Sequence, residues 1–148
     1  MLDYRISSDL DQMDFDFIYS FISQSYWAKG MPRELCQRAL QNSWCFALFD
    51  GNQQQLAFAR LITDRATFAY LADVFVSPQH QGKGLGKAIV QQILDQPEVK
   101  GLRRLVLATA DAHGLYEKLG FEPLSNPERF MQIWQPSVYQ QGEHSGES

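Results

Sequence analysis

The chain has 148 residues, of which 45% are hydrophobic and 20% charged, with a formal net charge of −4. This length suits one domain with a single core, and the negative charge disfavours a nucleic-acid partner while mildly favouring a cationic one. The sequence has no apolar run long enough to span a bilayer and no secretion signal at its first residues, so we expect a cytoplasmic protein with no membrane partner.

Hydrophobic spacing in the first half predicts helices followed by strands. A short strand is expected at 4–6, then a helix over 13–22 with Asp11 as its candidate N-cap, and a second helix after Pro32. Two strands, at 44–49 and 56–62, form a predicted hairpin, and a longer strand follows at 67–76.

The second half predicts fewer strands. A helix is expected over 85–94, a strand at 105–108, a helix over 112–119 and a last strand at 130–134. Residues after Pro136 are polar, and we expect a frayed tail there. Antiparallel hairpins with one parallel crossover predict an α+β sheet, with residues 1–135 as a single domain and 136–148 as the tail.

Three glycines at alternate positions stand between the strand at 67–76 and the helix at 85–94. Gly82, Gly84 and Gly86 allow a sharp turn and a close approach of the backbone to a ligand. They lie where the free N–H groups of a helix N-terminus would face an anion, and Lys83 and Lys87 add positive charge. A phosphate site and a plain glycine-rich turn with solvated lysines both explain this segment taken alone.

Two common phosphate motifs do not match these glycines. The P-loop requires Ser or Thr after Gly-Lys, but Gly86 and Lys87 are followed by Ala88. The dinucleotide-binding motif requires a glycine where this chain has Lys87. A nucleotide site of either kind is therefore disfavoured.

The pattern Gln/Arg-x-x-Gly-x-Gly/Ala is satisfied by Gln81, Gly84 and Gly86, and it resembles the acetyl-CoA signature of the GNAT N-acetyltransferase superfamily. The later run from Ala112 to Phe121, Ala-His-Gly-Leu-Tyr-Glu-Lys-Leu-Gly-Phe, is similar to a second element of that family. The resemblance extends over residues 3–135. It implies the GNAT fold, a central mixed and mostly antiparallel sheet flanked by helices, and an acetyl-CoA-dependent N-acetyltransferase.

The resemblance also assigns roles to residues. Tyr116 takes the place of the family's acid, whose phenol protonates the departing thiolate. A tyrosine packing its ring on the sheet is the alternative. The residues implied for the cofactor are the strand residues Val74, Phe75 and Val76, which present backbone groups to the acetyl and pantetheine arm, and the pyrophosphate cradle of Gln81, Gly82, Lys83, Gly84, Leu85, Gly86 and Lys87.

The residue that would act as the general base is less clearly defined by the sequence. Asp73 is the only carboxylate between Ala66 and Val76, whereas the family's glutamate falls nearest Tyr70 and Ala72. Strand alternation places Asp73 with Leu71 and Phe75, and Tyr70 with Ala72, Val74 and Val76, unless a bulge intervenes. Asp73 as the base, Asp73 as a structural carboxylate, and a water relayed by Tyr70 or Asp73 all remain open.

The acceptor site is expected in the first two helices and their junction. Tyr26 and Trp27 form either an aromatic wall for the acceptor, with Tyr70 on the strand, or part of the core. Arg60 is unusual within an apolar strand and either pairs with a neighbour or binds an acceptor carboxylate. Thr109 replaces the family's asparagine, Asp111 is a candidate helix cap, and His113 either packs at the helix start or acts at the site.

The function expected from these residues is direct acetyl transfer to a primary amine of a small molecule. A non-catalytic acyl-CoA-binding module and an acetyltransferase of protein lysines or N-termini are the alternatives. The two cysteines, Cys36 and Cys45, and the three histidines lack metal-ligand spacing, so no metal is expected, and buried free thiols are the expected state. A homodimer is compatible with these expectations.

Overall fold

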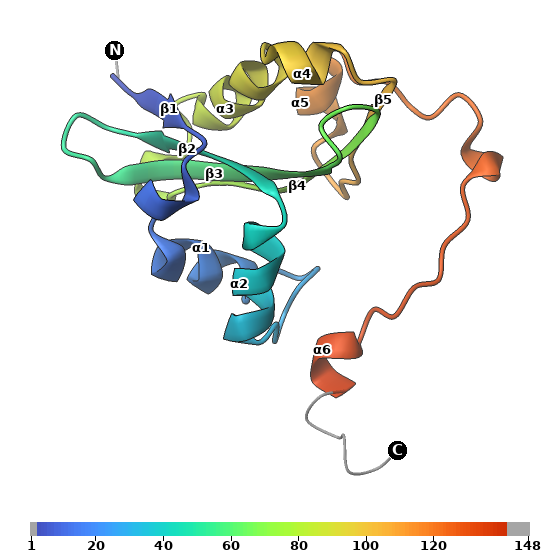
Figure 1. Ribbon diagram of the computed structural model, residues 1–148, viewed down its shortest axis with the longest axis horizontal. Coiled ribbons are helices and arrows are strands. Elements are labelled where there is room, and N and C mark those ends of the chain that lie inside the picture. The colour runs from blue at the N-terminus through green and yellow to red at the C-terminus, as the bar shows by residue number, and fades with distance from the viewer. Residues whose placement is uncertain (1–2, 142–148) are drawn as a thin grey trace.

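The computed structural model describes residues 3–141 and contains a five-stranded sheet with helices on both faces (Figure 1). The strand order is β1-β2-β3-β4-β5; β1 to β4 pair antiparallel, and β5 runs parallel to β4. The bounds are β1 (Arg5–Ser7), β2 (Trp44–Phe49), β3 (Gln55–Thr63), β4 (Phe68–Val76) and β5 (Arg104–Val106). This arrangement confirms the expected mixed, mostly antiparallel α+β fold.

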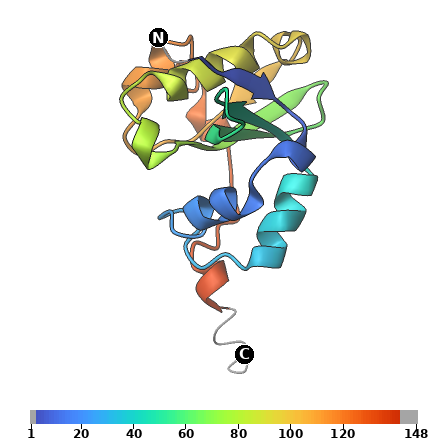
Figure 2. The same cartoon turned by 90° about the vertical axis from the view of Figure 1, so that its left-hand side faces the viewer.

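Helices cover the two faces separately. Figures 1 and 2 show α1 (Phe15–Ile22) and α2 (Arg33–Gln41) on one face, and α3 (Leu85–Leu94), α4 (Pro97–Lys100) and α5 (His113–Glu117) on the other. Alternate residues of β2 and β3 enter one apolar cluster under α3 and another under α1 and α2. Within the described residues, no helix is both long and apolar enough to cross a membrane.

The first helix is capped by a different aspartate from the one expected. Asp14 is the N-cap of α1, and its Oδ1 accepts a hydrogen bond from the N–H of Phe17 at 3.1 Å. Asp11 lies instead in a short 3₁₀ helix (Leu10–Gln12), which is capped by Asp9. The prediction of Asp11 was wrong because several aspartates lie close together before the apolar positions of α1 and offer the same local signal.

A bulge in β4 changes which side chains share a face. Phe58 of β3 lies opposite Phe75, but Arg60 lies opposite Ala72, so β4 carries one extra residue between them. Asp73 sits in this bulge with a φ of +54°. Ala72 therefore shares the α1–α2 face with Phe75, and so does Tyr70, two residues before Ala72. The simple alternation that grouped Tyr70 and Ala72 with Val74 was wrong, because it holds only on each side of the bulge.

The C-terminal region departs most from expectation. No strand forms at residues 130–134, which lie in an extended segment outside the sheet, and every residue from Glu122 to Val138 is exposed. The short helix α6 (Val138–Gln141) follows, and Tyr139 packs against the apolar cluster of α1 and α2. The expected frayed tail is therefore wrong for residues 138–141, while 142–148 lie outside the described residues.

Candidate active site

The sheet opens between β4 and β5. The two strands pair only from Phe68 and Arg104 to Tyr70 and Val106. Strand β4 continues to Val76, so within the described chain no strand pairs with the outer edge of its residues 71–76. This edge offers backbone N–H and C=O groups to a ligand. It includes Val74, Phe75 and Val76, the three strand residues predicted to contact the cofactor.

The glycine turn leads from this edge into α3. Gly82 and Gly84 have φ values of +81° and +79°, and Gly84 is the N-cap of α3 with no side-chain capping bond. The first intrahelical donor is the N–H of Ala88, which donates to the Gly84 carbonyl at 3.0 Å. The N–H groups of the first helical turn are therefore left for an external anion.

The surroundings of the turn fit a phosphate group. A Cβ added at Gly82 or Gly84 would meet no atom within 4 Å, so the space above both is open. Lys83 and Lys87 are exposed beside it, and the first turn of α3 carries no acidic residue. Just before the turn, Nδ1 of His80 is buried without a hydrogen-bond partner among the described residues. These features can hold a pyrophosphate group.

The predicted cofactor residues divide into two kinds. The side chains of Phe75 and Leu85 are buried in the core, where Phe75 stacks on Phe21 with ring centroids 4.0 Å apart. Such residues can offer only their backbone to a ligand. Gln81 has a different local role, because its Nε2 donates to the carbonyl of Val76 at 3.4 Å and so links the strand end to the turn.

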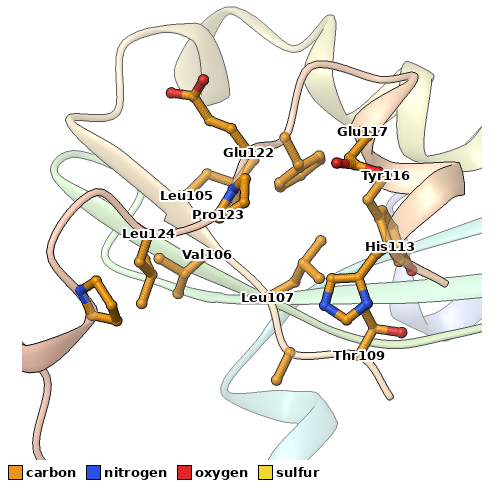
Figure 3. Close-up of a pocket in the computed structure, with 13 residues that line it drawn as sticks. Leu105, Val106, Leu107, Thr109, His113, Tyr116, Glu117, Glu122, Pro123 and Leu124 are labelled. Atoms are coloured by element: carbon orange, nitrogen blue, oxygen red, sulfur yellow. The ribbon is translucent and has the colours of Figure 1, made fainter. Parts of the chain in front are cut away.

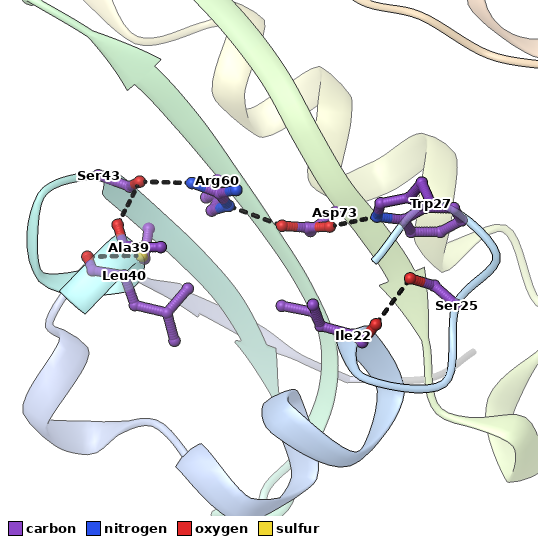
Figure 4. A network of polar contacts seen from close by, with 9 residues as sticks. Ile22, Ser25, Trp27, Ala39, Leu40, Ser43, Arg60 and Asp73 are labelled. Carbon is purple, nitrogen blue, oxygen red and sulfur yellow. Dashed lines mark hydrogen bonds and ion pairs between the residues drawn. The ribbon is translucent and has the colours of Figure 1, made fainter. Parts of the chain in front are cut away.

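A polar network crosses the α1–α2 face at the bulge (Figure 4). Asp73 Oδ1 accepts a hydrogen bond from Trp27 Nε1 at 2.7 Å, and Asp73 Oδ2 accepts one from Arg60 Nε, also at 2.7 Å. Arg60 Nη1 then donates to Ser43 Oγ at 2.9 Å. The side chains of Asp73 and Arg60 are only 4% and 14% exposed. Arg60 therefore pairs with a neighbour, and the role of Asp73 as a base stays a prediction.

The aromatic residues before α2 lie beside this network. Tyr26 is 74% exposed and Trp27 46%, and their rings meet edge to face at 5.0 Å between centroids. Neither residue is buried in the core, and the aromatic wall stays a prediction. Tyr70 is half-buried on the same face of β4 as Asp73. Sequence reasoning missed Ser43 and the contact of Trp27 with Asp73, because no local pattern signals either.

Tyr116 lies on the other side of the open edge, in a cavity of about 490 Å³ formed by β5, α5 and residues 121–127 (Figure 3). Burial raises the pKa of its phenol above the ordinary value. The phenol is thus kept protonated, as a general acid requires.

Thr109 and His113 line the same cavity as Tyr116. The Thr109 hydroxyl accepts a hydrogen bond from the N–H of Ala112 at 3.0 Å and so holds the turn before α5. Ala112 is the N-cap of α5, with no side-chain capping bond. The candidate cap Asp111 was therefore wrong, because Thr109 supplies the local acceptor.

Comparison with known proteins shows the family of this chain. The Acetyltransferase (GNAT) family matches residues 11–121. A Gibberella zeae protein assigned as an acetyltransferase is 33% identical over 138 residues, covering 78% of this chain and 77% of that protein. The alanine N-acetyltransferase of ribosomal protein bS18 from Escherichia coli is 34% identical over 76 residues, 49% of each chain.

A solved structure extends the likeness to nearly the whole chain. A GNAT-family protein of Xanthomonas campestris, assigned as an acetyltransferase, superposes with a TM-score of 0.89 at 45% identity, covering 94% of this chain and 98% of that one. The chain belongs to the GNAT family, the acetyl-CoA-dependent N-acetyltransferases. The family and the class of enzyme expected from the two motifs are thereby confirmed.

Proposed function

We propose that this protein transfers the acetyl group of acetyl-CoA directly to a primary amine of a small molecule. The observation that carries the proposal is the edge of β4 at residues 71–76, which no strand of the described chain pairs with. An uncapped glycine turn follows it, and exposed aromatic side chains lie on the α1–α2 face. The glycine turn can hold the pyrophosphate, and the edge can hold the acyl arm. The acceptor would then approach past Tyr26 and Trp27.

The chain's own groups supply the chemistry of such a transfer. Acetyl-CoA brings an activated thioester. Backbone N–H groups on the open edge of β4 stabilise the negative charge that develops on the thioester oxygen. Tyr116 donates its proton to the departing thiolate, and burial, which raises the pKa of the phenol, keeps that proton available. The amine must lose a proton first, because its pKa is about 10.4 in water.

We infer a small acceptor from the region around Tyr26 and Trp27, where the acceptor would approach. The exposed aromatic wall of this region is built by one short segment, and the chain carries a net charge of −4 with no basic stretch to bind an acidic peptide. A protein N-terminus is the second candidate, because the Escherichia coli relative is named for acting on an alanine of a ribosomal protein. Neither cysteine lies in a matched motif, which favours direct transfer.

The experiment measures release of free thiol from acetyl-CoA with a panel of small amines and a panel of peptides. We expect turnover with small amines and a fall in kcat of about 100-fold in Tyr116→Phe, the usual scale of one general acid. Tyr4→Phe, which removes a hydroxyl outside the site, should keep wild-type kcat. Turnover with peptides alone would contradict the small-molecule acceptor. Binding of CoA without turnover on any amine would instead support the non-catalytic module.

A further inference from the structure

The side chains in the last third of the described chain are less buried than those in the rest of the chain. From residue 100 to 140, no side chain is buried, whereas both core clusters are filled by residues up to Val99. The apolar residues of β5, of the segment after it and of α5 are only partly covered, among them Leu105, Leu107 and Tyr116. A sheet edge with half-covered apolar side chains is incomplete, since such edges are normally paired or covered.

The C-terminal arm, which we define as residues 130–134, is the most exposed apolar segment. Met131 and Ile133 are 96% and 95% exposed, and Trp134 is 71% exposed. Its sequence, Phe-Met-Gln-Ile-Trp, has strong β propensity. Exposed apolar residues gathered in one short segment are typical of a surface that another molecule covers.

Contacts at both ends hold the arm outside the molecule. At one end the guanidinium of Arg104 lies over the ring of Phe130, 4.9 Å from the ring centroid. Beyond the other end, Tyr139 of α6 packs on the cluster of α1 and α2. Between them the arm bows away from the sheet (Figure 1). It does not occupy the edge of its own β5.

The cavity of about 490 Å³ lies beside β5. One wall is β5 and its continuation, residues 105–109, and the opposite wall is the segment 121–127 (Figure 3). Apolar side chains of both walls face it, with Val106 and Leu107 on one side and Pro123 and Leu124 on the other. In the described chain, no strand pairs with this outer edge of β5. We call this space the slot.

We propose that the slot receives the C-terminal arm of a second copy of this chain, and that the two copies exchange arms to form a homodimer. The inserted arm adds a strand beside β5. Met131 and Ile133 then point together toward the α5 face, next to Leu105 and Leu107, while Gln132 points to the opposite face. Because each copy has one arm and one slot, a twofold axis closes the assembly and leaves neither arm exposed.

A second copy fits the slot better than an unrelated partner, because the arm is complementary to the slot. The slot needs an apolar strand with two free edges, and this chain presents such a strand, already extended, just outside it. The arm's attachment to β5 through Phe130 and Arg104 places it at the rim of the same edge. The exchange therefore brings together the exposed arm and the slot, both of which belong to the same chain.

The first test is the mass in solution at micromolar concentration, by sedimentation equilibrium. The wild type should be a dimer. Ile133→Asp should be a monomer, because it would bury a charge under α5, whereas Gln132→Asp, the same charge one residue away, should remain a dimer. A monomeric wild type, or a dimer that Ile133→Asp leaves unchanged, would overturn the proposal. Ile133 makes almost no contact within its own chain, so its loss should not unfold the protomer.

The second test separates exchange between chains from insertion of an arm into its own slot. One chain carries Ile133→Cys and the other Ala108→Cys, a position lining the slot, and a short bismaleimide is added to the mixture. The native cysteines are buried and should not react. A linked species of twice the protomer mass supports the exchange. A chain carrying both substitutions that links only within itself contradicts it.

Discussion

At the scale of single residues, Asp73 combines an uncommon backbone conformation with a buried charge. Its φ of +54° is tolerated by aspartate and asparagine better than by most residues. Its two oxygens accept hydrogen bonds from Trp27 and Arg60, which come from a loop and from a neighbouring strand. The side chain thus ties the acceptor segment to the bulge, and we infer a positioning role for it.

Replacing Asp73 with asparagine should test this role, because asparagine keeps the backbone preference and removes only the charge. Arg60 would be left buried without a counter-ion, so we expect a loss of about 3 kcal/mol in the free energy of unfolding, measured by urea denaturation. The double variant Arg60→Gln with Asp73→Asn should recover part of that loss. If Asp73 also acts as the base, kcat falls in Asp73→Asn and stays low in the double variant, where part of the stability has returned.

Cys45 gives a second prediction, in alkaline solution. Burial raises the pKa of its thiol from an ordinary value of 9.0 to about 12, and Sγ donates to the Leu40 carbonyl at 3.4 Å. The unfolded chain ionises this thiol near the ordinary pKa while the folded chain does not. Its contribution to stability is therefore complete below pH 9 and declines as the pH rises toward 12.

We expect Cys45 to account for a loss of about 1.4 kcal/mol in unfolding free energy by about one pH unit above its unfolded pKa. Urea denaturation at several pH values measures it. Cys45→Ser is the matched control, because serine can keep the bond to the Leu40 carbonyl but does not titrate. The difference in unfolding free energy between wild type and Cys45→Ser should change steadily as the pH rises. Parallel curves would show that another group causes the alkaline loss.

At the scale of elements, the glycine turn is the part of the site that rests on backbone geometry. Gly84→Ala places a Cβ at a φ of +79° and into the open space above the turn. We expect about 1 kcal/mol of lost stability from the left-handed conformation and an increase of about tenfold in the Kd for CoA. Isothermal titration calorimetry and urea denaturation measure the two effects.

Gly51→Ala is the control for this substitution, since Gly51 is also exposed in a turn, has open space around its Cβ position and does not have a positive φ. It should leave the Kd for CoA unchanged. An equal loss of affinity in both variants would show that the effect is not specific to the α3 turn.

The elements differ in how far the sequence could predict them. The hairpin of β2 and β3, the helix α3 and the glycine turn can be predicted, because their signals are local: alternation, helical spacing and glycine. The bulge at Asp73 cannot, because it depends on pairing with β3. The arm at 130–134 has the composition of a strand, yet a strand also needs a paired neighbour, and the arm does not pair with the free edge of its own β5. Likewise Trp27 and Asp73 are 46 positions apart, beyond any local pattern.

At the scale of the whole molecule, the sheet separates two layers with different tasks. The α1–α2 layer carries the exposed aromatics of the proposed acceptor side, and the α3–α5 layer carries the glycine turn and Tyr116. They meet along the open edge of β4. A ligand that occupies this edge would contact both layers. Its binding should therefore raise the free energy of unfolding of the entire domain.

Thermal unfolding should therefore respond to CoA. A ligand present at about 100 times its Kd adds about 2.7 kcal/mol to the folded state, which for a domain of this size corresponds to a rise in Tm of roughly 8 °C. ATP and NAD at the same concentration should give far smaller rises, because the turn matches neither the P-loop nor the dinucleotide motif. Gly84→Ala should reduce the rise with CoA, and Gly51→Ala should not. An equal rise with ATP or NAD would mean that the turn recognises phosphates in general, and that the pantetheine arm gains nothing from the open edge of β4.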